Sequence, residues 1–274
     1  MGMEFDFIDF TDVSNIEAHI RPNTKLIFSE TPANPTLVLT DIVAVSELAK
    51  SKGVLHVVDS TFATPIITRP LELGADLVIQ STTKFYDGHN ITVGGAVAAQ
   101  TTELYEMIKH MQNVHGNIMS PQNAFYTLQT TKTMGLRVLQ QSATAMKIAL
   151  FLEKHPAVDI VCYPGLESHP QKELADRQHI NGVHGTMLWF EVKGGTESGR
   201  SMMNSIMRPW SLCENLGAVE SICTCPAVMT HGNMLPEDRL KVGITDGFVR
   251  ISCGLEDPDD LIASLKASLD LLGF

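Results

Sequence analysis

Cysteine is scarce in this chain, and the cysteines that occur do not suggest cross-links. There are five in 274 residues, an odd number, and none forms a Cys-x-x-Cys pair. Cys223 and Cys225 are separated by one residue, but no histidine pair stands nearby at ligand spacing, so a metal site is not indicated. The N-terminus also lacks a basic region before an apolar stretch. Together these absences predict a reducing compartment, the cytoplasm.

Positive charge and long apolar runs are also lacking. Twenty Lys and Arg residues face 31 Asp and Glu residues, which gives a formal net charge of −11 at pH 7. This balance argues against general binding of nucleic acid or of anionic membranes. The apolar runs are far shorter than the roughly 20 residues of a membrane span. The composition that remains, 44% hydrophobic and 19% charged, is that of a globular protein with one large domain or two smaller ones.

The first third of the chain alternates between helical and extended patterns. Short apolar runs bounded by polar residues are typical of buried strands, and apolar residues three or four apart are typical of helices. The predicted strands are 26–28, 54–58 and 75–79, and the predicted helices are 12–20, 41–51 and a short crossover at 71–74. This alternation predicts a parallel sheet covered by helices.

Polar residues follow each of these three predicted strands. They are Glu30 and Asn34, then Asp59, then Ser81, Thr83 and Lys84. Right-handed crossovers bring such strand ends to one side of the sheet, where ligands bind in open α/β folds. A lysine among hydroxyl groups there could lose its proton and attack a carbonyl. Two plainer interpretations stay open: a solvated surface lysine and ordinary loop composition.

A different pattern follows the predicted sheet. A helix is predicted from Pro121, interrupted at Gly135, and a long helix from about residue 136 to 155, which Pro156 ends. Because long helices often bridge domains, we place a boundary near residue 145 and predict domains 1–144 and 145–274. Further strands are predicted at 160–163, 187–192 and 248–252, before an amphipathic helix at 259–272.

Five separate segments of the chain resemble one family. They are Val58-Asp59-Ser60-Thr61-Phe62, residues 69–77, Ser81-Thr82-Thr83-Lys84-Phe85, Gly88-His89 and residues 249–256. In this order they resemble the Cys/Met-metabolism family of pyridoxal-phosphate enzymes. The resemblance implies an α/β fold of the PLP-dependent transferase fold type I, aspartate-aminotransferase-like. It implies an incomplete large domain at 1–144 and a smaller α+β C-terminal domain at 145–274.

The resemblance also implies how pyridoxal 5'-phosphate would be held. Lys84 would form the internal aldimine with the cofactor aldehyde and then move protons between substrate carbons. Asp59 would pair with the pyridinium nitrogen and keep it protonated. Ser81 and Thr83 would donate hydrogen bonds to the phosphate, and Thr61 would lie against the ring.

For the substrate, the resemblance implies a sulfur-containing amino acid. Arg250 would hold its carboxylate with help from Asn34; the alternative role for Arg250 is a structural ion pair. Asn215 stands where relatives usually carry serine, and Glu214 resembles the acidic residue of γ-cleaving cystathionine enzymes, although a solvated or capping role is also open. The implied reaction is at Cγ of cystathionine or an activated homoserine, of the cystathionine γ-lyase or γ-synthase type. Methionine γ-lyase and cystathionine β-lyase activities are the alternatives.

Relatives carry more chain before the point that matches Met1, including a phosphate-binding loop and residues lent by a neighbouring subunit. The sequence therefore favours either a partial sequence of an active enzyme or a truncated, catalytically impaired chain that acts as an oligomer partner. The family implies a homo-oligomer, a dimer of dimers with shared active sites. A magnesium site formed by Glu30 and Asp59 is a less favoured interpretation, because the amine of Lys84 would compete.

Overall fold

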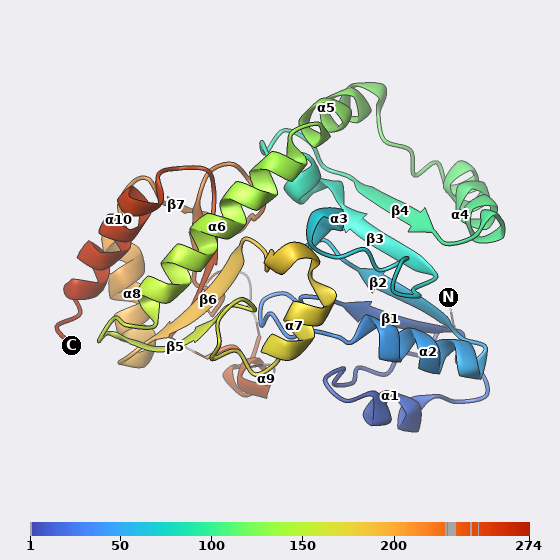
Figure 1. Cartoon of the computed structure of the whole chain (residues 1–274), viewed down its shortest axis with the longest axis horizontal. Helices are drawn as coiled ribbons and strands as arrows, with labels where there is room; N and C mark the ends of the chain where they lie inside the picture. The colour runs from blue at the N-terminus through green and yellow to red at the C-terminus, as the bar shows by residue number, and fades with distance from the viewer. Residues whose placement is uncertain (1, 228, 230–233, 242, 246) are drawn as a thin grey trace.

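Two β-sheets, joined by one long helix, organise the protein (Figure 1). The structure is a computed structural model, and it describes residues 2–227, 229, 234–241, 243–245 and 247–274. The first sheet has the order β1 (Leu26–Glu30), β2 (Leu55–Asp59), β3 (Leu77–Ser81) and β4 (Gly95–Ala99). The first three strands are parallel and β4 is antiparallel to β3. The carboxyl ends of β1, β2 and β3 therefore lie at the same edge.

Helices α1 (Val13–His19) and α2 (Ile42–Lys52) cover the start of the first sheet. The carboxylate of Asp41 accepts the backbone N–H of Ala44 and begins α2, and Gly53 ends it at a positive φ of 66°. The apolar faces of both helices meet β1 in a small core that includes Ile16, Ile27, Val45, Ala49 and Val54.

The second sheet is mixed. It contains β5 (Val158–Cys162), β6 (Met187–Val192), β7 (Ser211–Leu212), β8 (Ile222–Thr224) and β9 (Phe248–Ser252), in the order β5-β6-β9-β8-β7. Strand β9 lies at its centre and every residue of it is buried. Helices α6 (Met134–Leu152), α8 (Gly195–Ser205) and α10 (Pro258–Asp270) pack on the sheet and enclose the largest core of the molecule.

Helix α6 runs from one half of the molecule to the other (Figure 1). Its first part packs against α3 (Thr64–Ile67) and α5 (Pro121–Thr131), and its later turns pack against β5, β6 and α10. The core of the second half begins, in chain order, at Ala145. Met134 and Val138 belong to a second cluster that contains residues of both halves, such as Phe62 and Leu216. The domains 1–144 and 145–274 remain a proposal.

Several element boundaries differ from the prediction. The break before the long helix falls at Lys132 and Thr133, and Gly135 lies inside α6. The helix ends at Leu152, before the residues predicted for its last turn. Residues 71–74 form tight turns instead of a helix, because their amides bond to carbonyls only three residues back.

Some elements were not predicted at all. They are α3, β4, α4 (Thr102–His115), α7 (Lys172–Gln178), α8, the short β7 and β8, and α9 (Pro236–Lys241). Among the described residues, no helix is long and apolar enough to cross a membrane.

Candidate active site

The ends of β2 and β3 are tied together by side chains of the predicted site. Asp59 is the last residue of β2, and its Oδ1 accepts the backbone N–H of Thr61 at 2.9 Å. The hydroxyl oxygen of Thr61 in turn accepts the backbone N–H of Ser81, the last residue of β3, at 2.9 Å. A carboxylate and two hydroxyl-bearing residues are therefore connected in one hydrogen-bonded run across neighbouring strands.

Lys84 follows β3 directly, in a π-helical turn, η1 (Thr82–Tyr86). Its backbone leaves the helical region, with φ −95° and ψ −118°. The turn is held to the chain before β4, because Thr83 Oγ1 accepts the Gly94 N–H at 3.0 Å and lies 3.3 Å from the Gly94 carbonyl. The side-chain Nζ of Lys84 donates to Asn215 Oδ1 at 2.6 Å. A residue 131 positions away thus contacts the amine.

Two effects lower the pKa of the Lys84 amine from its usual value. Partial burial disfavours the charged form, and the positive charge of Arg250 adds to this effect. An amine with a lowered pKa supplies more of its neutral, nucleophilic form near neutral pH.

Arg250 occupies the middle of β9 and is only 3% exposed. One end of its guanidinium, Nη1, donates to Asn34 Oδ1 at 2.8 Å. The other end, Nη2, lies 3.3 Å from the Glu214 carbonyl and 3.5 Å from the Asn215 carbonyl. These partners in the described part of the chain are uncharged oxygens, so the ion pair that the sequence left open is not observed there.

Asn34 lies in the loop after β1, and Glu30 at the end of that strand steadies it. Glu30 Oε1 accepts the backbone N–H of Asn34 at 3.1 Å. Burial raises the pKa of the Glu30 carboxyl to about 7, and the neighbouring charge of Asp59 acts in the same direction. In the parallel pairing of β1 and β2, these two residues lie opposite each other. Within the described ranges, no group of three His, Cys, Asp or Glu side chains is arranged to hold a metal ion.

The structure therefore brings the predicted residues into two connected sets. Asp59, Thr61 and Ser81 form the first, with Thr83 and Lys84 in the turn that follows. Asn34, Glu214, Asn215 and Arg250 form the second. The hydrogen bond between Lys84 and Asn215 joins the two sets. Only the backbone carbonyl of Glu214 touches Arg250, since the Glu214 side chain is exposed.

Sequence reasoning missed residues that hold the Asn215 loop in place. Ser252 Oγ accepts the backbone N–H of Gly217 at 2.8 Å. Gly217 has a φ of +80° and lies so close to the turn of Lys84 that a Cβ there would be 3.0 Å from the Phe85 nitrogen. Asn90, on the turn after Lys84, accepts a hydrogen bond from Asn215 Nδ2 and donates one to Glu220. Each contact joins residues distant in the chain, so no local pattern indicates it.

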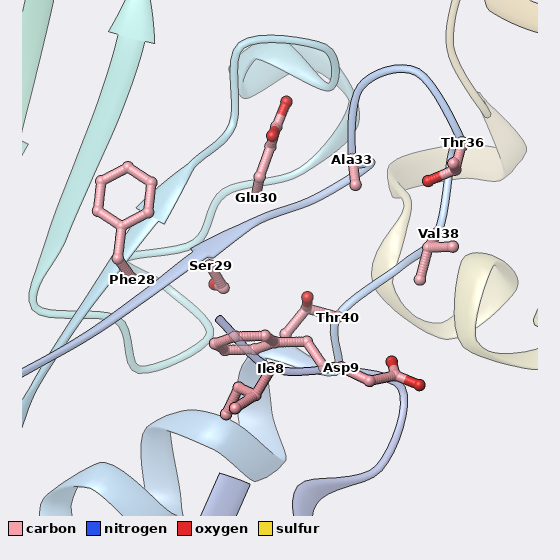
Figure 2. Close-up of a pocket in the computed structure, with 10 residues that line it drawn as sticks. Ile8, Asp9, Phe28, Ser29, Glu30, Ala33, Thr36, Val38 and Thr40 are labelled. Carbon is pink, nitrogen blue, oxygen red and sulfur yellow. The ribbon is translucent and has the colours of Figure 1, made fainter. Parts of the chain in front are cut away.

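A separate hollow of about 360 Å³ lies beside β1 (Figure 2). The N-terminal segment around Ile8 and Asp9 forms one wall, and residues between Ala33 and Thr40 form another. Lys84, Asp59 and Arg250 are not among the residues that line it. Glu30 does line the hollow, so the hollow borders the hydrogen-bonded site at the end of β1 without containing the amine or the guanidinium.

Comparison with known proteins identifies the family. Residues 1–270 match the model of the Cys/Met metabolism PLP-dependent enzymes. The chain belongs to this family. It is 42% identical over 270 residues to the cystathionine gamma-lyase of Bacillus subtilis (strain 168), covering 98% of this chain and 70% of that protein. It is 45% identical over 273 residues to the L-methionine gamma-lyase of Porphyromonas gingivalis (strain ATCC BAA-308 / W83), covering 99% of this chain and 68% of that protein.

A solved structure supports the fold. The crystal structure of cystathionine gamma-lyase from Lactobacillus plantarum complexed with L-serine superposes with a TM-score of 0.94 at 38% identity. The match covers 98% of this chain and 70% of that chain. The predicted α/β fold of the PLP-dependent transferase type is thus confirmed, as is the family itself.

The donor set of the site fits the family's cofactor. Pyridoxal phosphate carries an aldehyde, a pyridine nitrogen and a phosphate, which call for an amine, a carboxylate and hydrogen-bond donors. Lys84 offers the amine, Asp59 the carboxylate, and Ser81 and Thr83 the hydroxyl groups, all within one stretch of linked strand ends. The chain is a PLP-dependent enzyme of sulfur amino-acid metabolism.

Proposed function

We propose that this chain acts at Cγ of cystathionine or of an activated homoserine, with the cofactor attached to Lys84. The observation that carries the proposal is that a single residue touches both reactive groups. The side-chain oxygen of Asn215 accepts a hydrogen bond from the Lys84 amine, and the backbone carbonyl of Asn215 lies 3.5 Å from the Arg250 guanidinium. The amine and the guanidinium thus contact the side chain and the backbone of the same residue.

In this proposal the strand ends hold the cofactor. Asp59 would face the pyridine nitrogen, Ser81 and Thr83 would donate to the phosphate, and Thr61 would lie against the ring. When bound, pyridoxal phosphate supplies the electron sink that stabilises negative charge at the substrate's Cα. The hydrogen bonds between Asp59, Thr61 and Ser81 support these roles, because they fix the spacing of the carboxylate and the hydroxyl groups.

Arg250 would bind the α-carboxylate of the amino acid, with Asn34 fixing the orientation of the guanidinium fork. A substrate held there would present its Cα–H toward Lys84, whose lowered pKa favours the neutral amine that takes up the proton. The same amine could then return the proton at another carbon. Lys84 would therefore move protons between substrate atoms while Arg250 keeps the substrate in register.

The exposed carboxylate of Glu214 supports the preference for a cystathionine-like substrate. Its negative charge lies near enough to influence the Arg250 guanidinium, and it is free to meet a distal ammonium group. The alternatives are the methionine γ-lyase and cystathionine β-lyase reactions, since related proteins are named L-methionine gamma-lyase and cystathionine beta-lyase.

Trapping of the cofactor tests the central role. Purified protein is mixed with pyridoxal phosphate, reduced with borohydride and digested, and the peptides are weighed by mass spectrometry. We expect the reduced pyridoxyl mass on Lys84, and none at that position in a Lys84→Arg variant. A label that is spread over exposed lysines such as Lys132 instead would contradict the proposal.

A substrate panel then distinguishes the reactions. Release of 2-oxobutanoate from cystathionine indicates γ-cleavage, and formation of cystathionine from an acylhomoserine and cysteine indicates γ-replacement. Pyruvate from cystathionine would instead indicate β-cleavage, and 2-oxobutanoate from methionine would indicate methionine γ-lyase activity. We expect Glu214→Ala to raise the KM for cystathionine about threefold to tenfold more than the KM for methionine, which has no distal ammonium group.

We also propose that the chain assembles as a homo-oligomer, a dimer of dimers with shared active sites, in the cytoplasm. Support for assembly comes from α4, whose apolar residues Met107, Met111 and Val114 are exposed along with the following Ile118. Support for a reducing compartment comes from the five cysteines, none of which forms a disulfide in the described part of the chain.

A further inference from the structure

A run of hydrogen bonds extends from the Lys84 amine to the surface through two amide side chains. Lys84 Nζ donates to Asn215 Oδ1 at 2.6 Å. Asn215 Nδ2 donates to Asn90 Oδ1 at 2.6 Å, and Asn90 Nδ2 donates to Glu220 Oε2 at 3.3 Å. Two of the residues, Asn90 and Glu220, are exposed and have no part in the cofactor or substrate roles described above.

The chemistry of the two ends sets the direction of this run. A lysine ammonium can only donate hydrogen bonds, and an ionised carboxylate can only accept them. The Asn215 atom that faces Lys84 must therefore be the oxygen, which leaves its NH₂ group to face Asn90. Asn90 must then accept with its own oxygen and donate with its NH₂ group to Glu220. Each amide has one orientation that satisfies both of its neighbours.

The backbone holds Asn90 in position for this contact. Asn90 has a positive φ of 57° on a tight turn. The buried carboxylate of Asp87 accepts the backbone N–H groups of His89 at 3.3 Å and Ile91 at 2.8 Å, on either side of Asn90. The turn also joins the Asn215 loop, because the Val219 N–H donates to the Gly88 carbonyl at 2.8 Å. Asn90 is therefore fixed relative to Asn215 before any ligand binds.

We propose that Asn90 is a positioning residue for Lys84, which keeps the carbonyl oxygen of Asn215 turned toward the amine, and that Glu220 sets the direction of the run. This inference rests on the proposed function of Lys84 for its importance to catalysis, but the geometry stands without it. An oxygen at 2.6 Å stabilises the protonated amine, whereas an NH₂ group turned toward it would disfavour that form. The run therefore acts to raise the pKa of Lys84, whereas burial and the positive charge of Arg250 lower it.

The experiment measures the Lys84 amine in cofactor-free protein. The rate of acetylation of Lys84 by a trace of acetic anhydride is followed against pH by peptide mass spectrometry, which gives the pH at half-maximal reactivity. Asn90→Gly removes the amide and suits the positive φ of this position. We expect its midpoint to fall by about half a pH unit, because Asn215 is then free to turn its NH₂ group toward the amine.

Two further variants separate the run of hydrogen bonds from general effects of mutation. Asn90→Asp retains an oxygen acceptor for Asn215 and should keep the midpoint at or above that of the parent protein. Glu220→Lys places a donor at the outer end, which favours the reversed orientation of both amides and should lower the midpoint. This decrease should persist in 0.5 M salt, where a direct effect between two exposed charges is largely screened.

An unchanged midpoint in Asn90→Gly, in a protein whose circular dichroism matches the parent, would overturn the proposal. If that variant does not fold, Glu220→Lys alone decides the outcome, because its side chain is exposed. Borohydride trapping at Lys84 is scored separately in each variant. A shifted midpoint without trapping in the parent protein would retain the positioning role and reject the proposed function.

Discussion

At the scale of single residues, Gly217 shows how closely the lysine turn and the Asn215 loop are packed. Its φ of +80° is one that L-residues rarely adopt, and a Cβ added there would lie 3.0 Å from the Phe85 nitrogen and 3.1 Å from the Lys84 carbonyl carbon. Both neighbours are backbone atoms that cannot rotate away. Glycine is thus required here for two independent reasons, conformation and space.

We therefore predict that Gly217→Ala destabilises the protein more than a typical glycine substitution. The strained backbone costs about 1–2 kcal/mol and the overlap with the lysine turn about 1–3 kcal/mol more. The control is Gly53→Ala, where φ is +66° but no atom lies within 4 Å of the added Cβ, so only the first cost applies. Urea unfolding measures the free energy of unfolding of each variant. Equal losses of unfolding free energy in the two variants would contradict the close packing described here.

The residues of the site differ in how well the sequence predicts them. Asp59, Ser81, Thr83 and Lys84 follow apolar strands, and parallel pairing alone implies that such strand ends meet. The contacts of Asn90 and Gly217 have no comparable local signal. They depend on where a loop 125 or more residues away folds back onto the lysine turn, which hydrophobic periodicity does not encode.

At the scale of elements, α7 fastens the second half of the molecule to the loop that carries Asn34. Gln171, just before α7, accepts the Leu39 N–H at 2.8 Å and donates to the Leu39 carbonyl at 2.7 Å. Gln178, at the end of α7, accepts the Ile42 N–H at 3.0 Å. The helix thus clamps the chain between Asn34 and α2.

Three buried histidines surround this clamp. The Nδ1 atoms of His179 and His184 are 3.2 Å apart, and His184 Nε2 lies 3.4 Å from Asp176 Oδ1. Burial lowers the pKa of His179 to about 3 and that of His169 to about 4, and it also lowers the pKa of His184. The charge of Lys172 opposes protonation of His184, whereas Asp176 favours it.

We predict that stability falls in acid because of this cluster. Each histidine is neutral in the folded state down to its lowered pKa but takes up a proton at about 6.5 when unfolded, so the unfolded state binds more protons below that pH. The contribution of these histidines to the free energy of unfolding is fully present above pH 6.5 and is lost as the pH falls toward 4. Between pH 7.5 and pH 5 the loss of unfolding free energy is about 2 kcal/mol each for His179 and His169, and His184 contributes in the same direction.

Urea unfolding at several pH values tests this expectation. His179→Phe should reduce the decrease in unfolding free energy between pH 7.5 and pH 5, because one titrating group is gone. The matched control is His19→Gln on the exposed side of α1. An identical pH dependence in His179→Phe and the parent protein would exclude the cluster as its source.

The elements themselves were predicted unevenly, for physical reasons. Strands β2, β6 and β9 are apolar runs bounded by polar residues, and α10 has apolar residues spaced by four, so periodicity finds them. Strand β4 is made of small residues and is mostly exposed, which leaves no alternation to detect. Helix α4 has apolar residues at helical spacing but fully buries none of them, and Met107, Met111 and Val114 stay exposed among the described residues.

At the scale of the whole molecule, α4 carries a stripe of exposed apolar residues. Met107, Met111 and Val114 are 55%, 47% and 61% exposed, and their spacing of four and three places them along one stripe of α4. Helix α4 lies at the margin of the molecule, next to β4 (Figure 1). This stripe is the contact that we propose between copies of the chain, because exposed apolar patches favour protein association.

We predict that Met107→Glu combined with Met111→Glu lowers the assembly state. Two carboxylates in an apolar interface would be desolvated without partners, which costs several kcal/mol and favours dissociation. Size-exclusion chromatography with light scattering measures the mass directly. Gln112→Glu, which adds charge off the stripe, is the matched control and should leave the mass unchanged. A double variant with the mass of the parent protein would place the contact between copies elsewhere.

The pairing of Arg250 with Asn34 limits how this chain can be recombined with its relatives. The two residues are 216 positions apart, and Arg250 lies in the second sheet whereas Asn34 lies in the loop after β1 of the first sheet, yet one 2.8 Å hydrogen bond joins them. A chimera joined within α6 would take Asn34 from one parent and Arg250 from the other. In the role proposed for Arg250 and Asn34, such hybrids would bind an amino acid only where both parents position these two groups alike. Substrate recognition would then depend on residues from both sides of the proposed domain boundary.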